Sequence, residues 1–299
     1  MEENRKVIAV VVTYNRKELL KEAIEALLNQ EYNNCDVLIV DNASTDGTRE
    51  YIDELLKDTR VHYENTGANL GGAGGFNYGM KRACQMGCDF VWVMDDDCIV
   101  HKDSLTELLN ADKLLNGNYG FLSSKVLWKD DSICKMNIQK ISLIKKVTDW
   151  NKEIQQVIMG TFVSFFIKKT IVEEIGLPIS DFFIWADDIE YSRRVSLKYP
   201  SYLVNKSIVS HKSKNNIGSN IVQDSIENLN RYSYAYRNER YVYKREGILG
   251  ILYYNLKNSL HKFRIRKSNM SKEEKKKKID VINKAVKEGK KFNPEVEFL

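Results

Sequence analysis

The sequence has few prolines, an odd number of cysteines and no long hydrophobic run, and each shortage excludes a class of protein. Its three prolines leave no proline-rich linker, and its five cysteines, without a CxxC pair, argue against a disulfide framework or a cysteine zinc site. No apolar run approaches the roughly 20 residues that a membrane-spanning helix needs. The first residues lead into the apolar run at 7–12 without the cleavage region typical of a signal peptide. We therefore expect a cytoplasmic protein with reduced thiols.

The charges that the sequence does contain are unevenly distributed. Residues 229–299 carry 19 Lys and Arg against 8 Asp and Glu, a net charge of +11, whereas residues 1–228 carry 27 against 33, a net charge of −6. We place a domain boundary between these two regions. The prediction is an acidic body in residues 1–228 and a basic, tyrosine-rich helical tail in residues 229–299.

Strand and helix patterns alternate along the first 130 residues. Runs rich in β-branched residues predict strands at 7–13, 36–40, 61–64, 90–94 and 119–127. Apolar residues at helical spacing predict helices at 17–30, 46–56, 75–86 and 104–115. Further strands are expected at 161–167 and 202–209, a helix at 186–198, a hairpin or excursion at 128–157, and helices from 224 onward. The expected fold class is α/β, with a Rossmann-like, mostly parallel central sheet flanked by helices and a C-terminal helical extension.

Three consecutive aspartates, Asp95, Asp96 and Asp97, follow the apolar run at 90–94. Open α/β sheets bind their ligands at the carboxyl ends of the strands, so these carboxylates are expected at the ligand-binding edge. Because three anions this close repel one another, their chemistry favours a hard divalent cation, itself able to hold a diphosphate. The alternative is a solvated acidic turn that caps the next helix.

Polar segments also end the first two predicted strands. Thr13-Tyr14-Asn15-Arg16 follows the first strand, and the segment DNASTDG, which begins at Asp41, follows the second. Asp46 is suited to capping the helix that comes after it. Asp41 either accepts a hydrogen bond from a nucleobase N–H group or belongs to an ordinary strand-end turn.

Four glycines occupy five positions at 71–75, between the third predicted strand and the helix predicted from Gly75. Glycine permits close approach of a ligand to main-chain N–H groups, and the start of a helix favours an anion. The stretch is neither the GxGxxG fingerprint of dinucleotide binding nor a P-loop. A flexible surface loop is the alternative.

The segment Trp185-Ala186-Asp187-Asp188-Ile189-Glu190 opens a predicted helix. Carboxylates at a helix start complement the macrodipole, which accounts for one or two of the three acids. A carboxylate held beside an aromatic wall is also suited to general base catalysis, and the flat face of tryptophan commonly packs against sugars. His211 ends the last predicted strand, where it is either structural or completes the coordination begun by the aspartates.

Taken in order, these motifs resemble inverting glycosyltransferases of family 2, which have the GT-A fold. The segments VVVTYNR, DNASTDGT, the DDD strand end and the late DD-x-E are that family's landmarks, and the similarity covers about residues 5–215. The segment NLGGAGGFNYGM, and WADDIEYSRR followed by a histidine 23 residues after Asp188, are similar to bacterial galactofuranosyltransferases and their rhamnose-transferring relatives. The best-known polymerising members of that subgroup are much larger, so we expect one or a few sugars to be added per acceptor.

The resemblance implies roles for individual residues. Thr13 and Asp41 would hold the uracil or thymine ring. The other donor-binding residues would be Arg16, Asn69, Gly71, Gly72, Asp95 and Asp96. Mn²⁺ or Mg²⁺ would be held by Asp95, Asp97 and His211. Asp188 would be the catalytic base that deprotonates the acceptor hydroxyl, with Trp185 and Asp187 contacting the acceptor.

The tail combines aromatic, aliphatic and basic residues, including the run Lys275-Lys276-Lys277-Lys278. This composition suits the surface of an anionic membrane, and the expected acceptor, a glycan or lipid-linked glycan, would make peripheral contact with the inner face of the plasma membrane useful. The alternative is a solvated helix whose tyrosines pack onto the body. No nucleic acid partner is expected, because the body is acidic. A homo-oligomer is compatible with the sequence.

The leading hypothesis is a metal-dependent inverting glycosyltransferase that uses UDP-galactofuranose in bacterial cell-surface polysaccharide synthesis. The alternative within the class is a rhamnosyltransferase that uses dTDP-rhamnose. A sugar nucleotidyltransferase is the alternative of another class, but it would need a Gly-rich, basic loop after the first strand to grip a triphosphate, and TYNRKE lacks the glycines.

Overall fold

Apolar β-branched sequence forms the centre of the molecule. The computed structural model describes residues 4–299 and places strand β1 (Val7–Thr13), which is buried at every residue, between β2 (Cys35–Asp41) and β4 (Phe90–Asp95). All three strands are parallel, and their carboxyl ends bring Thr13, Asp41 and Asp95 to one edge of the sheet. This edge is the one at which the sequence predicted a ligand site.

The strands form one sheet in the order β3-β2-β1-β4-β8-β6-β9-β5, and β7 also pairs with β9. The remaining strands are β3 (Val61–Asn65), β5 (Cys98–Val100), β6 (Phe121–Trp128), β7 (Ile154–Val157), β8 (Phe165–Lys168) and β9 (Ser201–His211). The half from β3 to β4 is parallel throughout, whereas β8, β5 and β7 make antiparallel pairs. The parallel half confirms the predicted βαβ units, and the sequence analysis missed β5 and β7.

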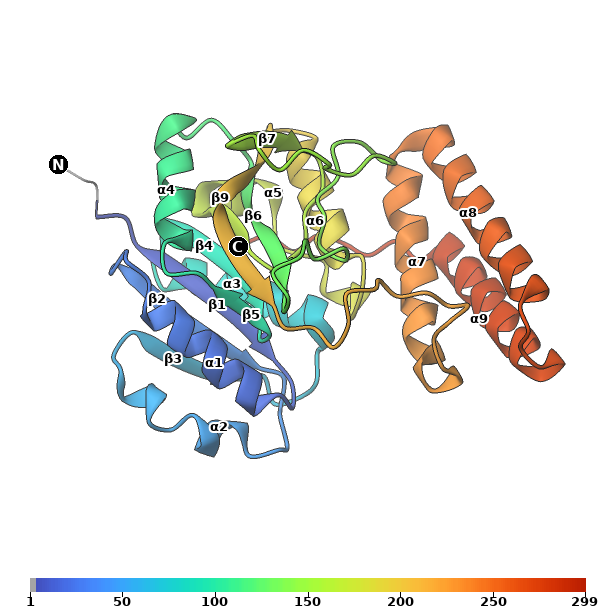
Figure 1. Cartoon of the computed structure of the whole chain (residues 1–299), viewed down its shortest axis with the longest axis horizontal. Helices are drawn as coiled ribbons and strands as arrows, with labels where there is room; N and C mark the ends of the chain where they lie inside the picture. The colour runs from blue at the N-terminus through green and yellow to red at the C-terminus, as the bar shows by residue number, and fades with distance from the viewer. Residues whose placement is uncertain (1–3) are drawn as a thin grey trace.

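Helices cover both faces of this sheet (Figure 1). Because side chains alternate along a strand, Ala9 and Val11 of β1 face one layer while Val10 and Val12 face the other. The first layer contains α1 (Lys17–Leu28) and α4 (Ser104–Leu114). The second contains α3 (Gly71–Gln85), α5 (Lys169–Ile175) and α6 (Asp187–Ser196). The predicted helix at 46–56 is shorter, with α2 (Thr48–Tyr51) followed by a 3₁₀ turn at Leu55–Lys57.

The glycine-rich stretch is the first turn and a half of helix α3, which begins at Gly71, four residues before the predicted start. The stretch is helical and not a loop, and its glycines let the helix lie close to the sheet. A Cβ atom at Gly75 would stand 2.5 Å from Val12, and one at Gly79 would stand 2.4 Å from Val10. Because Gly75 and Gly79 have no side chain, α3 packs directly against β1, and its N-terminus lies at the ligand-binding edge.

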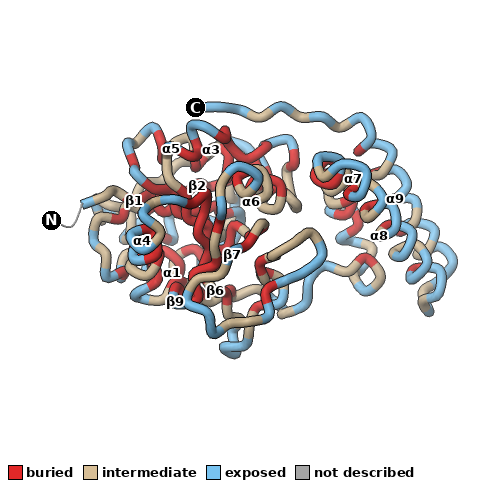
Figure 2. Tube along the Cα trace, turned by 90° about the horizontal axis from the view of Figure 1, so that it is seen from above, coloured by how far each residue is buried: buried red, intermediate tan, exposed pale blue. Residues whose placement is uncertain are grey.

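Helices α7 (Leu229–Arg245), α8 (Gly247–Lys267) and α9 (Lys272–Lys291) pack on one another at one end of the molecule. Helix α7 is fastened to the body by an ion pair of 2.5 Å between Glu246, the residue after it, and Arg193 of α6. The chain after α9 runs back over the body, where the carbonyl of Glu297 accepts a hydrogen bond from Leu177 (Figure 2). The boundary between residues 228 and 229 stays a prediction.

Within residues 4–299, no helix is long and apolar enough to cross a membrane.

Candidate active site

The aspartates at the end of β4 are held by residues from the end of β1. The hydroxyl of Thr13 donates a hydrogen bond of 2.7 Å to the carboxylate of Asp96. Nη1 of Arg16 lies 3.1 Å from Asp96 Oδ1 and 3.0 Å from Asp97 Oδ2, so one guanidinium bridges two carboxylates. Arg16 therefore supplies one permanent positive charge to a cluster of three potential negative charges, and the titratable His211 contacts the same cluster.

Burial and mutual repulsion set the protonation of this cluster. Burial, together with the charge of Asp97, raises the pKa of Asp95 to about 7. Burial also raises the pKa of Asp96 to about 6, although Arg16 opposes the shift. Burial acts in the same direction on Asp97, but its contacts with His211 and Arg16 prevail and lower the pKa. A second cation would stabilise the fully ionised cluster.

His211 is brought to the cluster by antiparallel pairing of β5 with β9, in which Cys98 lies opposite His211. Its Nε2 atom lies 3.0 Å from Asp97 Oδ1. Its Nδ1 atom donates to Oδ1 of buried Asn137 at 2.8 Å, a contact that aims Nε2 at the aspartates, where a protonated Nε2 donates to Asp97 and a deprotonated one could bind a cation. Burial lowers the pKa of His211, but the contacts with Asp97 and Cys134 raise it overall to about 10. Asn137 lies in the irregular segment at 128–157 and carried no sequence signal.

Among the described residues 4–299, no group of three or more His, Cys, Asp or Glu side chains is already arranged to hold a metal ion. Asp97 and His211 pair with each other instead. The donor set nevertheless suits a divalent cation, because within these residues buried Asp97 Oδ1 meets only His211 Nε2, and carboxylate oxygens and imidazole nitrogens are both ligands of such ions. The ligand set Asp95, Asp97 and His211 stays a prediction.

A cavity of about 520 Å³ opens beside this cluster. Seven of the eight predicted donor-binding residues line it: Thr13, Arg16, Asn69, Gly71, Gly72, Asp95 and Asp96. The lining residues that the sequence analysis did not predict include three on α7, Asn230, Arg231 and Tyr234. Their signal was the aromatic, basic segment RYSYAYR, which indicated packing onto the body but not a contribution to this cavity.

Asp41 is the predicted donor-binding residue that does not line the cavity. It is 1% exposed, and both of its carboxylate oxygens are occupied. One accepts the N–H of Ser44 at 2.8 Å, and the other accepts the hydroxyl of Tyr63 at 2.5 Å. A nucleobase contact by Asp41 would require exchange of one of these partners and stays a prediction.

The segment 183–186 separates this cavity from a second one, and its backbone is strained. Phe183, Trp185 and Ala186 have φ angles of 61°, 67° and 65°, in the left-handed region that residues with a Cβ atom rarely adopt. Fully buried Asn238 of α7 holds the segment, since its amide donates to the carbonyls of Phe182, Ile184 and Trp185 at 2.9, 3.1 and 2.8 Å. Helix α7 thus fixes the backbone conformation of the segment that leads into α6.

Gly71 is fitted to the same segment. It has a φ angle of +71°, and a Cβ atom there would stand 2.1 Å from the carbonyl oxygen of Phe183. The N–H of Ala73 donates to that oxygen at 3.1 Å. The N-terminus of α3 and the strained segment are therefore locked together at the cavity.

The three acids that open α6 have different surroundings. Asp187 is buried, and burial, together with the charges of Asp188 and Asp95, raises its pKa well above the usual range. Burial raises the pKa of half-buried Asp188 to about 6, while its hydrogen bond from Ile189 and the charge of Lys140 oppose the shift. Buried Glu190 pairs with Arg194 and with Arg245 of α7, which makes it structural. Asp188 is the acid poised to exchange a proton near neutral pH.

These observations can be compared with known proteins. The family profile described as Glycosyl transferase family 2 matches residues 8–176. The chain belongs to glycosyltransferase family 2. Over 91 residues it is 38% identical to the galactofuranosyltransferase GlfT1 of Mycolicibacterium smegmatis, and this alignment covers 30% of each chain. Over 186 residues it is 30% identical to the glycosyltransferase GlyG of Streptococcus pneumoniae, and this alignment covers 56% of this chain and 58% of that protein.

Each of these two matches spans less than two thirds of the relative's length. Among solved structures, GalNAc-T7 with UDP, GalNAc and Mn²⁺ aligns with a TM-score of 0.58 at 15% identity, over 78% of this chain and 49% of that one. The predicted family and the GT-A fold of this glycosyltransferase family are confirmed.

Proposed function

We propose that this family 2 member is an inverting, metal-dependent glycosyltransferase that transfers galactofuranose from UDP-galactofuranose to a glycan or lipid-linked glycan acceptor. The observation that carries the proposal is the convergence of seven predicted donor-binding residues on one cavity. These residues come from the ends of β1 and β4 and the start of α3. The similarity to GlfT1 of M. smegmatis supports the choice of galactofuranose.

The cavity is suited to a nucleoside diphosphate. Positively charged Arg16 and Arg231 and the N-terminus of α3 can meet the diphosphate, and Tyr14 offers an aromatic side chain, whereas the ring of Tyr234 already stacks on Phe183. Mn²⁺ or Mg²⁺, held by Asp95, Asp97 and His211, would supply Lewis-acid stabilisation of the departing diphosphate. GalNAc-T7 was crystallised with UDP and Mn²⁺, which supports the same chemistry here.

Asp188 is the proposed general base. In its ionised form it takes the proton of the acceptor hydroxyl, whose oxygen then forms a bond to the anomeric carbon as the bond to the nucleoside diphosphate breaks. The reaction has a single displacement and inverts the anomeric centre. A raised pKa of about 6 strengthens Asp188 as a base while leaving it mostly ionised at neutral pH.

Transfer of rhamnose from dTDP-rhamnose remains the second candidate, because the same motifs resemble both kinds of enzyme. The family match removes the basis for the sugar nucleotidyltransferase alternative. Calorimetry of UDP and dTDP with and without Mn²⁺ separates the remaining two. Tight, Mn²⁺-dependent UDP binding supports the galactofuranosyl proposal, preference for dTDP supports the rhamnosyl one, and binding of neither nucleotide contradicts both.

His211→Ala should weaken Mn²⁺ binding in the same experiment, and an unchanged Mn²⁺ titration would contradict its role as a ligand.

Helix α8 supports the proposed contact with an anionic membrane. Large apolar side chains are exposed along one side of it at helical spacing: Leu249, Leu252, Leu256, Leu260 and Phe263. Exposed Arg264 and Arg266 flank this stripe at helical spacing. Apolar insertion flanked by positive charge suits a cytoplasmic position at the inner face of the plasma membrane.

The lysine run of the sequence analysis contributes less than its composition indicated, because Lys278 is 2% exposed and donates to the carbonyls of Val222 and Asp224. Flotation with phosphatidylglycerol vesicles tests the contact. Leu256→Asp should release the protein from the vesicles, and an equal charge change at exposed Asn228 should not. Equal binding by both variants would contradict the role of the stripe.

A further inference from the structure

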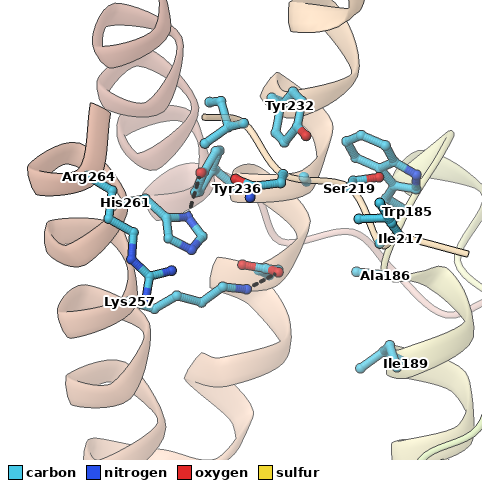
Figure 3. Close-up of a pocket in the computed structure, with 15 residues that line it drawn as sticks. Trp185, Ala186, Ile189, Ile217, Ser219, Tyr232, Tyr236, Lys257, His261 and Arg264 are labelled. Atoms are coloured by element: carbon cyan, nitrogen blue, oxygen red, sulfur yellow. Dashed lines mark hydrogen bonds and ion pairs between the residues drawn. The ribbon is translucent and has the colours of Figure 1, made fainter. Parts of the chain in front are cut away.

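A second cavity of about 500 Å³ lies where α6, the segment 217–221, α7 and α8 meet (Figure 3). Trp185 and Tyr232 lie on one side of it, and Lys257, His261 and Arg264 of α8 lie on the other. Its volume falls in the range of about 300–1,000 Å³ that small-molecule sites in proteins occupy. It lies across the strained segment 183–186 from the donor cavity, because Phe183 and Ile184 line one cavity while Trp185 and Ala186 line the other.

One buried polar atom in this cavity has no partner. Glu239 of α7 uses Oε1 to accept from Lys257 at 2.6 Å, while its buried Oε2 makes no hydrogen bond within the described residues. A carboxylate oxygen without a donor is costly, and rotation of the Glu239 carboxylate, whose side chain is 24% exposed, would let a ligand hydroxyl in the cavity donate to it.

The surroundings of Glu239 favour a sugar as the source of that hydroxyl. Trp185 and Tyr232 meet edge to face with ring centroids 5.1 Å apart, so the cavity has an aromatic wall. A sugar ring has an apolar C–H face, which packs on such a wall, and a rim of hydroxyl groups. His261, whose pKa burial lowers, is neutral at physiological pH and hydrogen bonded to the Tyr236 hydroxyl at 2.8 Å.

The cavity also lies beside the proposed base. Ala186 and Ile189, which line it, flank Asp187 and Asp188 in α6. A sugar that occupies the cavity therefore lies next to the start of α6, although Asp188 is not itself among the lining residues and the reacting hydroxyl would have to reach past Ala186 or Ile189.

We propose that this cavity binds the terminal sugar of the acceptor, and that Glu239 sets acceptor specificity by accepting a hydrogen bond from a hydroxyl other than the reacting one. The inference rests on the proposed function, since it places the second substrate of that reaction. It assigns to the C-terminal helices a role in acceptor recognition, in addition to membrane contact.

The test fills the cavity without removing any polar group. Ala235 of α7 lines the cavity, so Ala235→Phe should occlude it. Asn255→Phe adds the same ring at an exposed position of α8 outside the lining and is the matched control. Binding of octyl β-galactofuranoside and octyl α-rhamnoside to the donor-free protein is followed by saturation-transfer NMR. UDP binding is followed by calorimetry, and folding by thermal melting.

We expect Ala235→Phe to abolish glycoside binding and Asn255→Phe to preserve it, with UDP binding unchanged in both. Glu239→Gln, which keeps the shape of the side chain, should raise the acceptor KM by on the order of tenfold while leaving the KM of the donor unchanged.

Three results would overturn the inference: no glycoside binding by the unmodified protein, glycoside binding retained in a folded Ala235→Phe variant, or an unchanged acceptor KM in Glu239→Gln. Absence of UDP binding in the unmodified protein would instead contradict the proposed function. The donor-free NMR measurement still reports on the cavity in that case.

Discussion

The two cavities are nearly equal in volume, about 520 and 500 Å³, but they are built in different ways. The donor cavity is lined mainly by residues at the ends of parallel strands and at the start of α3. The second cavity is lined by Trp185 and Ala186 before α6, by Ile189 of α6, by the segment 217–221 and by α7 and α8, and none of these lining residues lies in a strand. The proposed donor site is thus built mainly by the ends of the sheet strands, with a contribution from α7, whereas most of the second cavity depends on how the C-terminal helices dock on the body.

Asp188→Asn tests the catalytic side of this comparison and should have the largest effect. Without a general base, kcat should fall by about 10²–10⁴-fold, while UDP binding is retained because Asp188 does not line the donor cavity. Radiolabelled transfer and UDP calorimetry on the same preparation measure both. Glu190→Gln is unsuitable as a control because Glu190 holds Arg194 and Arg245. Substantial turnover by Asp188→Asn would remove Asp188 from the role of base.

Gly71→Ala tests the junction between the cavities. Gly71 and exposed Gly67 have similar φ angles of +71° and +73°, so an alanine at either position has similar backbone strain. Only at Gly71 would the new Cβ meet another group, the carbonyl of Phe183. Gly71→Ala should therefore be destabilised by about 1–3 kcal/mol more than Gly67→Ala in urea unfolding. It should also weaken UDP binding, and equal stability of the two variants would contradict the contact.

Asn238→Leu tests whether the tail positions the acids of α6. The change leaves three carbonyls of residues 182–185 without their amide donor, at an expected cost of about 1–3 kcal/mol in stability. It should also lower kcat more than it raises the KM of the donor, since the segment leads into Asp187 and Asp188. Asn258→Leu is the control, because that buried amide makes no hydrogen bond of ordinary geometry. Identical kinetics of the two variants would show that Asn238 is only structural.

Lys140→Met should produce the smallest effect, a change in pH dependence. Asp188 must be ionised to act as base, so kcat should fall as the pH drops through about 6. The charge of Lys140 lowers the pKa of Asp188, and removing it should move this acidic limb to higher pH, by up to about one unit. A pH–rate profile of both proteins measures the shift. Movement to lower pH would mean that another group controls the limb.

Many residues of the donor cavity could be predicted because the end of a buried strand is recognisable in the sequence. An apolar run followed by a polar residue locates the edge of a parallel sheet, and Thr13, Asp95 and Asp96 lie there as expected. Asp41 satisfied the same rule, yet Ser44 and Tyr63 occupy its carboxylate. Local sequence shows where a strand ends but not which side chains across the sheet will use its last residue.

The sequence by itself determined the parallel strands, the helices between them and the acids at their ends, because periodicity and turn chemistry act over a few residues. Only the tertiary structure decided how Asn137 orients His211, how Asn238 holds the strained segment, and where the second cavity lies. Those contacts join residues tens of positions apart, and no local pattern encodes them. They form when helix α7 and the segment at 128–157 pack against the sheet edge whose strand ends were predictable from the local sequence.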